Sequence, residues 1–192
     1  MAHSLRVKGF AATSVVAELT GLDERTVTGV LEDLRDAGHA RVREGRWSLT
    51  PDGRVHHATS CAVDLVTSGR YDRVREGYGG FVALNGTFLQ VCADWQVKGG
   101  SPQLNDHTDA AYELGVVERL TAIDDRVQPV VDDLGGRFAG YGPRLTGARA
   151  RVESGERDWF TGAMIDSYHT VWFELHEDLL ATLGLERAKE AS

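Results

Sequence analysis

The stretch of sequence with the most evident chemical potential lies between Asp158 and Glu177, where acidic residues and histidines alternate with aromatic residues. On a helix, Asp166, His169 and His176 would share one face, because residues three, four and seven apart lie on the same side. Three such side chains could bind a metal ion or an acidic ligand. His169 and His176, however, would lie about 10 Å apart at a rise of about 1.5 Å per residue, too far to share one metal ion. We therefore expect no metal and no cofactor, and we interpret these histidines as residues of a helix surface or a pocket.

Most of the aromatic side chains lie after residue 60. Such side chains can line a pocket for a small molecule, but they also form cores and subunit interfaces. Both interpretations stay open at this point. If a ligand pocket exists, its candidate residues are Trp95, Tyr168, His169, Trp172 and His176.

The arginines of the first sixty residues form another chemical group, because guanidinium groups bind phosphates and base edges. Residues 1–60 contain eight basic and eight acidic residues, whereas the rest of the chain contains 13 basic and 21 acidic residues. The net charge of −8 therefore lies entirely after residue 60, and it excludes a protein that coats nucleic acid through bulk charge. The uneven distribution indicates two modules, residues 1–60 and residues 61–192.

The elements that position these arginines can be predicted from the apolar spacing. A short helix is expected with Thr13 or Ser14 as its N-cap and Gly21 at its end. A second helix, residues 24–37, is expected to follow the N-cap Asp23. Its apolar stripe, with the spacing i, i+3, i+4 and i+7, consists of Val27, Val30, Leu31 and Leu34.

Two short strands, residues 40–43 and 46–49, are predicted after the second helix, with a Glu-Gly turn between them. Thr50 is expected to cap the next helix, and Pro51 to occupy its first turn. Two helices joined by a glycine-containing turn and followed by a two-stranded hairpin are typical of a helix-turn-helix with a wing.

The segment AELTGLDERTVTGVLEDLRDAGHARVREGRWSLTPDGR resembles the winged helix-turn-helix of bacterial transcription regulators of the MarR and GntR families. The resemblance rests on the L-T-G-L turn, the T-V-x-x-V-L-x-x-L frame of the second helix, the A-G-H-A-R-V entry to the wing and the W-S-L-T-P-D-G exit from it. It covers about the first third of the chain. It implies that the helix over residues 24–37 enters the major groove of DNA and that the wing contacts the backbone or the minor groove.

Six residues are the candidates for contact with DNA under this resemblance. Arg25 could form two hydrogen bonds to a guanine, while Thr26 and Thr28 could contact phosphate or a thymine methyl group. The wing offers Arg41, Arg43 and Arg46. Three acidic residues on or beside the same helix would repel the DNA phosphates, namely Glu24, Glu32 and Asp33. Because winged helices also serve as protein-docking domains, a protein-interaction adaptor without DNA binding is the alternative function.

The remaining two thirds of the chain are predicted to be entirely helical, because no alternation with a period of two occurs after the wing. Five features are expected there: a helix from Tyr71 onward, a cap at Asp106 or Thr108, separate helices over residues 111–123 and 127–134, a turn over residues 140–143, and a final helix from Ile165 to Leu183. A loop is expected over residues 98–102, which contain two glycines and a proline.

Other site types are not indicated by the sequence. Some GntR regulators hold a metal ion in a helical domain with one Asp and three His, but the required spacing is missing, and His107 and Asp109 are the nearest candidates. Cys61 and Cys92 lie outside any CxxC or Cys/His metal motif and indicate a reducing compartment. Neither a phosphate-binding loop nor a nucleophile elbow occurs, so we expect no enzyme. Without a signal or membrane segment, a cytoplasmic location is expected.

The sequence therefore predicts a mainly α fold with two parts. An N-terminal winged helix-turn-helix, with a three-helix core and a two-stranded wing, is followed by an all-α helical bundle. The predicted function is a regulator of transcription that binds double-stranded DNA. A homodimer is expected because one recognition helix contacts too few base pairs, and the helical part would mediate dimerisation and could sense a small-molecule effector.

Overall fold

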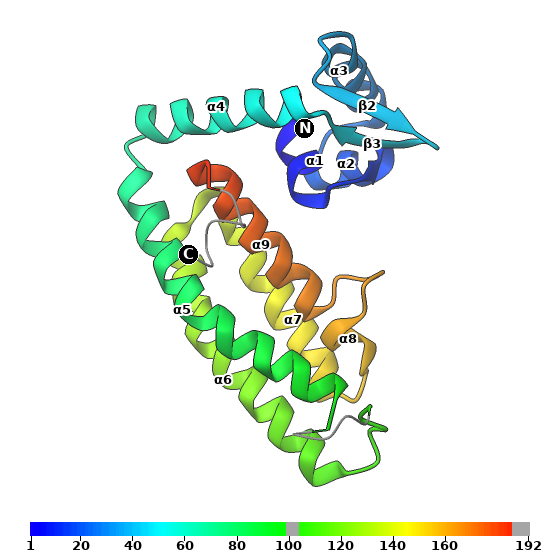
Figure 1. Ribbon diagram of the computed structural model, residues 1–192, viewed down its shortest axis with the longest axis vertical. Helices are drawn as coiled ribbons and strands as arrows, with labels where there is room; N and C mark the ends of the chain where they lie inside the picture. The colour runs from blue at the N-terminus through cyan, green and yellow to red at the C-terminus, as the bar shows by residue number, and fades with distance from the viewer. Residues whose placement is uncertain (99–103, 186–192) are drawn as a thin grey trace. The chain divides into compact units, whose positions relative to one another are not determined.

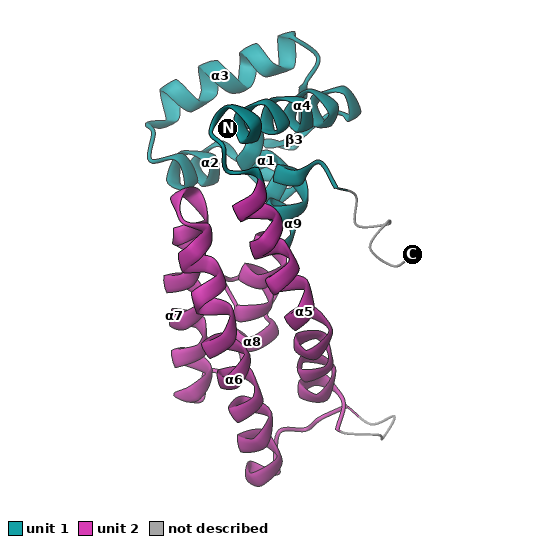
Figure 2. Cartoon of the chain, turned by 90° about the vertical axis from the view of Figure 1, so that its left-hand side faces the viewer, with its two compact units in different colours: residues 1–71, 176–192 teal, residues 72–175 magenta. Residues whose placement is uncertain are grey.

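The computed structural model describes residues 1–98 and 104–185, which belong to two compact units (Figure 1). Unit 1 consists of residues 1–71 and the C-terminal segment that begins at residue 176, and unit 2 consists of residues 72–175 (Figure 2). The described residues are mainly helical and include one small antiparallel sheet. This confirms the predicted mainly α class.

Unit 1 contains a three-stranded antiparallel sheet with helices packed around it (Figure 1). Its elements are α1 (Ala2–Lys8), β1 (Ala11–Ala12), α2 (Thr13–Thr20), α3 (Glu24–Asp36), β2 (Ala40–Arg43), β3 (Arg46–Leu49), α4 (Pro51–Thr67) and the C-terminal half of α9 (Tyr168–Leu183). The strand order is β1-β3-β2. β2 pairs with β3 from Ala40 opposite Leu49 to Arg43 opposite Arg46. The two predicted strands are thereby confirmed at their predicted boundaries.

The turns and caps that shape this sheet follow from the local sequence. The turn between β2 and β3 places Glu44 and Gly45 at φ values of 50° and 72°, the left-handed conformation that a tight two-residue hairpin requires. As predicted, Thr50 caps α4, because its Oγ1 accepts a hydrogen bond of 3.0 Å from the Gly53 amide. The same hydroxyl donates to the Gly38 carbonyl oxygen at 2.6 Å and so ties the end of the hairpin to the turn after α3.

The structure corrects three expectations for unit 1. The N-cap of α2 is Ala12 instead of Thr13 or Ser14, and the Oγ1 of Thr13 accepts a hydrogen bond of 3.2 Å from the Trp47 indole. Val30 is 37% exposed and lies outside the buried stripe of α3. The first twelve residues contain a helix, α1, and a third strand, β1, which the sequence analysis did not predict.

One hydrophobic core joins α1, α2, α3 and the three strands within unit 1. It comprises Leu5, Ala11, Val16, Ala17, Val27, Leu31, Ala40, Trp47 and Leu49, with Met1, Ala2 and Leu34 partly buried against it. α1 and β1 thus contribute Leu5 and Ala11 to the same core as the helix pair and the hairpin. In this core Val27 and Leu31 pack α3 against the hairpin.

Replacing Gly53 by alanine is expected to destabilise unit 1, whereas Gly29→Ala is expected to stabilise it. A Cβ atom at Gly53 would overlap the backbone carbonyl of His39, so the cost should be about 1–3 kcal/mol in the free energy of unfolding. At Gly29 a Cβ atom meets nothing within 4 Å, and alanine favours a helix by about 1 kcal/mol relative to glycine. Chemical denaturation of both variants tests this, and equal stabilities would contradict it.

Unit 2 is built from antiparallel helices (Figure 2). Its elements are α5 (Tyr71–Gln96), α6 (Ala110–Leu134), the 3-10 helix η1 (Gly136–Gly140), α7 (Tyr141–Glu153), α8 (Asp158–Thr161) and the N-terminal half of α9. α5 and α6 run in opposite directions, because Asp94 binds Arg119 while Gly77 lies against Leu134. A Cβ atom at Gly77 would come within 2.6 Å of Leu134, so this glycine permits close helix packing.

Several boundaries in unit 2 differ from those expected. α6 is one continuous helix that passes through Pro129, because its buried residues keep a spacing of three and four from Val116 to Leu134. Its N-cap is Asp109, which accepts a hydrogen bond from the Tyr112 amide, instead of Asp106 or Thr108.

The starts of α7 and α9 also differ from those expected. Residues 141–143 form the first turn of α7, although a turn was expected over residues 140–143. α9 begins at Tyr168, so Ile165 precedes the helix. The predicted start of α5 at Tyr71 is confirmed, and the expected loop over residues 98–102 lies largely outside the described residues.

Within the described part of the chain, no helix is both long and apolar enough to cross a membrane.

Candidate nucleic-acid interface

The two helices α2 and α3 are joined by a three-residue turn over residues 21–23. Gly21 ends α2 in the left-handed conformation, with φ 67°, and Asp23 caps α3. Val27 and Leu31 on the inner face of α3 are fully buried in the core of unit 1. The opposite face of α3, including Arg25, is exposed to solvent.

The hydrogen bonds at the start of α3 distinguish Arg25 from the two candidate threonines. Thr26 Oγ1 donates to Asp23 Oδ2 at 2.6 Å, and Thr28 Oγ1 donates to the Glu24 carbonyl oxygen at 2.7 Å. Because each hydroxyl proton is already used, neither threonine can donate to a phosphate in this conformation. Arg25 is exposed in the first turn of α3, where its guanidinium group has access to an external acceptor.

The cap of α3 retains its charge over a wide pH range. The Thr26 hydroxyl and the Thr26 amide, both bonded to the Asp23 carboxylate, hold the pKa of Asp23 below its ordinary value. A lowered pKa in the folded state means that the cap contributes at neutral pH and is lost only as the pH falls through that lowered pKa.

Arg41, Arg43 and Arg46 share one face of the β2–β3 hairpin. Arg43 pairs directly with Arg46, and Arg41 pairs with Ser48; paired residues, and residues two apart, lie on the same side of a sheet. All three arginines are exposed, and Arg41 Nε donates to Ser48 Oγ at 3.3 Å. Ser48 was not among the predicted site residues, although the strand alternation places it on the arginine face.

Acidic side chains interrupt this cationic surface. Glu24, Glu32 and Asp33 on α3 are exposed, and Glu44 lies at the hairpin tip between two arginines. The predicted DNA-contacting arginines therefore form two local groups, Arg25 on α3 and the arginine face of the hairpin. Binding of an anion would have to use these groups at short range.

The structure does not bring the five candidate ligand residues of the helical part together at one pocket. Tyr168 and Trp172 are core residues of unit 2, 0% and 2% exposed. The Trp172 indole donates to Asn85 Oδ1 at 3.0 Å, and the Tyr168 hydroxyl donates to Asp124 Oδ1 at 3.0 Å. These two aromatic residues therefore hold α9 against α5 and α6 in unit 2.

The acidic and histidine residues around the start of α9 have separate surroundings. His169 packs beside the Phe88 ring, and burial lowers the pKa of His169. His176 is buried, and it belongs to unit 1. Asp166 precedes α9 and pairs with Arg144 at 2.9 Å, so it does not share a helical face with the histidines, contrary to expectation.

Trp95 lines a pocket in the described part of unit 2. The pocket has a volume of about 460 Å³, and its lining also includes His107 and Arg157. Trp95 is 5% exposed and packs against Phe160, while His107 Nδ1 lies 2.8 Å from a Glu113 carboxylate oxygen.

Comparisons with protein-family models, with curated proteins and with solved structures find no match for this chain. A functional assignment therefore rests on the geometry of α3 and the hairpin.

Proposed function

We propose that unit 1 is a winged helix-turn-helix domain that binds double-stranded DNA, and that the protein is a transcription regulator. The main support is the placement of Arg25 on the exposed face of α3 together with the arginine face of the adjoining hairpin. In this arrangement α3 would enter the major groove, while Arg43 and Arg46 at the hairpin tip would contact phosphates or the minor groove.

The division of labour between these arginines follows from their chemistry. A guanidinium group matches the O6 and N7 acceptors of guanine, so Arg25 in the first turn of α3 is suited to recognition of a base. Contacts from the hairpin arginines to phosphates would position the domain without selecting a sequence. Arg41, held by Ser48, would orient the hairpin face.

A homodimer fits this proposal, since α3 alone can contact only a few base pairs. Apolar side chains exposed on the helices of the two units provide surfaces for a second copy. They include Val55, Val63 and Val66 on α4 and Val82 and Leu89 on α5, which are between 38% and 76% exposed.

Removing the two arginines at the hairpin tip should weaken DNA binding and reduce its dependence on salt. Each lost phosphate contact lowers the slope of log K against log salt by about 1, so Arg43→Ala combined with Arg46→Ala should lower it by about 2. Fluorescence anisotropy with a labelled duplex at several salt concentrations measures the slope, and the end point of the titration gives the number of chains per duplex.

The matched control for the hairpin variant replaces Arg73 and Arg126, two exposed arginines of unit 2, by alanine. This control removes the same charge and should leave the slope unchanged. If both double variants change the slope equally, the hairpin has no special role. If the intact chain binds no duplex at low salt while it remains folded, the protein-interaction adaptor replaces the regulator.

A further inference from the structure

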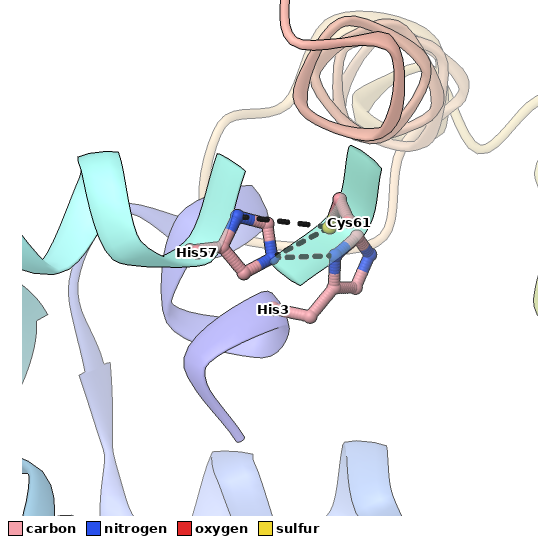
Figure 3. Close-up of side chains that lie close together, drawn as sticks. All are labelled: His3, His57 and Cys61. Carbon is pink, nitrogen blue, oxygen red and sulfur yellow. Dashed lines mark hydrogen bonds between the residues drawn. The ribbon is translucent and has the colours of Figure 1, made fainter. Parts of the chain in front are cut away.

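Three metal-ligating side chains converge inside unit 1, between α1 and α4 (Figure 3). His3 Nδ1 lies 3.1 Å from His57 Nε2, and Cys61 Sγ lies 3.4 Å from the same nitrogen of His57. One ligand atom from each residue lies within 4.8 Å of the other two. Figure 3 shows His3 from α1 and His57 and Cys61 from α4 pointing toward one another.

Two of the three ligand separations match those around one tetrahedral zinc ion, and the third, between His3 and Cys61, lies within 4.8 Å and would have to shorten to about 3.6 Å when the ion binds. With Zn–N bonds of about 2.0–2.1 Å and a Zn–S bond of about 2.3 Å, two ligand nitrogens are about 3.3 Å apart, and a nitrogen and a sulfur about 3.6 Å apart. The distances of 3.1 Å and 3.4 Å are each within about 0.2 Å of these values. His57 and Cys61 are four residues apart on α4, which places both on one face of the helix.

The Asp178 carboxylate lies beside the Nε2 atom of His3, whereas the Nδ1 atom of His3 faces His57. Asp178 Oδ2 lies 3.0 Å from His3 Nε2, at ion-pair distance although without the alignment of a hydrogen bond. The Asp178 side chain is 3% exposed, and its Oδ1 accepts a hydrogen bond of 3.1 Å from Thr182. Histidine ligands of metals commonly have such a carboxylate behind them, because it fixes the ring orientation and raises the basicity of the ligand nitrogen.

The burial and the charge of the surrounding residues also suit a metal ion. His57 and Cys61 are 5% and 8% exposed. One Zn²⁺ ion, one thiolate and the Asp178 carboxylate would give no net charge, which favours a buried site. A cavity of about 220 Å³ is lined in part by His57, although neither His3 nor Cys61 lines it.

We propose that His3, His57 and Cys61 bind one Zn²⁺ ion, with Asp178 positioning His3. The site goes beyond the proposed DNA binding and does not depend on it. It would link α1 to α4 in unit 1. No metal was expected from the sequence. The four-residue spacing of His57 and Cys61 on one helix is a signal for such a site, but only the fold brings His3 to them.

The test uses tag-free, full-length protein that has been freed of metal with a chelator and titrated with Co²⁺ as a spectroscopic substitute for zinc. We expect one Co²⁺ ion per chain, with the near-ultraviolet absorption of a thiolate–cobalt bond and the visible bands of tetrahedral cobalt. Added Zn²⁺ should abolish both. Cys61→Ser should remove the thiolate absorption, and Asp178→Asn should weaken metal binding by about 10- to 100-fold.

The matched control is Cys92→Ser, which removes the other buried cysteine. Burial raises the pKa of the Cys92 thiol to about 12, so this residue should remain a protonated thiol and the variant should bind cobalt normally. If Cys61→Ser fails to fold, His3→Gln provides the test, because the His3 side chain is partly exposed and its replacement should disturb the fold less. This variant should lower the cobalt affinity at least about 10-fold. Absence of the thiolate band in the intact chain, or its loss in Cys92→Ser alone, overturns the proposal.

Discussion

Replacing Trp172 by alanine is expected to lower the free energy of unfolding of unit 2 by about 3–5 kcal/mol. The indole ring packs against Phe81 and Phe88, with ring centroids 4.6 Å and 4.4 Å away, and donates a hydrogen bond to Asn85. Alanine would leave a cavity and an unpaired amide at the contact between α9 and α5. Chemical denaturation followed by far-ultraviolet circular dichroism measures the loss.

Phe173→Ala provides the control, because Phe173 is the next residue on α9 and is 45% exposed. Its loss of stability should be clearly smaller than that of Trp172→Ala. Equal losses would mean that Trp172 is not a core residue of the kind the structure describes. A Trp172→Ala variant with an unchanged free energy of unfolding would contradict a core role for Trp172 and would leave this side chain a candidate for ligand binding.

Replacing Arg25 by alanine is expected to weaken binding to the preferred DNA sequence by about 5- to 150-fold, which corresponds to about 1–3 kcal/mol for one bidentate contact to a base. The effect should be small on unrelated duplexes, because Arg25 selects a base while the hairpin arginines contact the backbone. The preferred sequence can be obtained by selecting duplexes from a random pool with the unaltered chain, and affinities then follow from anisotropy titrations.

Arg25→Lys separates charge from geometry. Lysine keeps the positive charge but lacks the planar guanidinium fork, so Arg25→Lys should recover at most part of the lost sequence preference and should leave binding to unrelated duplexes unchanged. The result that contradicts this role is an Arg25→Ala variant that keeps the full preference for the selected sequence. Equal loss on selected and unrelated duplexes would instead make Arg25 a phosphate contact.

The parts of unit 1 that sequence reasoning located correctly have strong local signals. Asp23 and Thr50 are side-chain caps, and the Glu-Gly turn fixes the hairpin, so α3, β2, β3 and the start of α4 could be predicted from a few neighbouring residues. The shared face of Arg41, Arg43 and Arg46 comes from the register of the hairpin. What these residues bind remains a prediction, because no local signal encodes a partner.

The missed features depend on contacts between residues far apart in the chain. β1 is only two residues long, and it exists because Ala11 and Ala12 pair with the edge of β3. α6 continues through Pro129 because its buried face packs along its whole length, which outweighs the hydrogen bond that proline removes. The cluster of His3, His57 and Cys61 likewise requires the fold, since 54 residues separate the two histidines.

The most direct test of DNA binding by unit 1 is a nuclear magnetic resonance titration of the isotope-labelled chain with its selected duplex. We predict that the largest changes in backbone amide shifts occur in the first two turns of α3, around Arg25 and Gly29, and at the hairpin tip, around Glu44 and Gly45. Changes confined to residues 72–175, or no changes at low salt, would contradict the account.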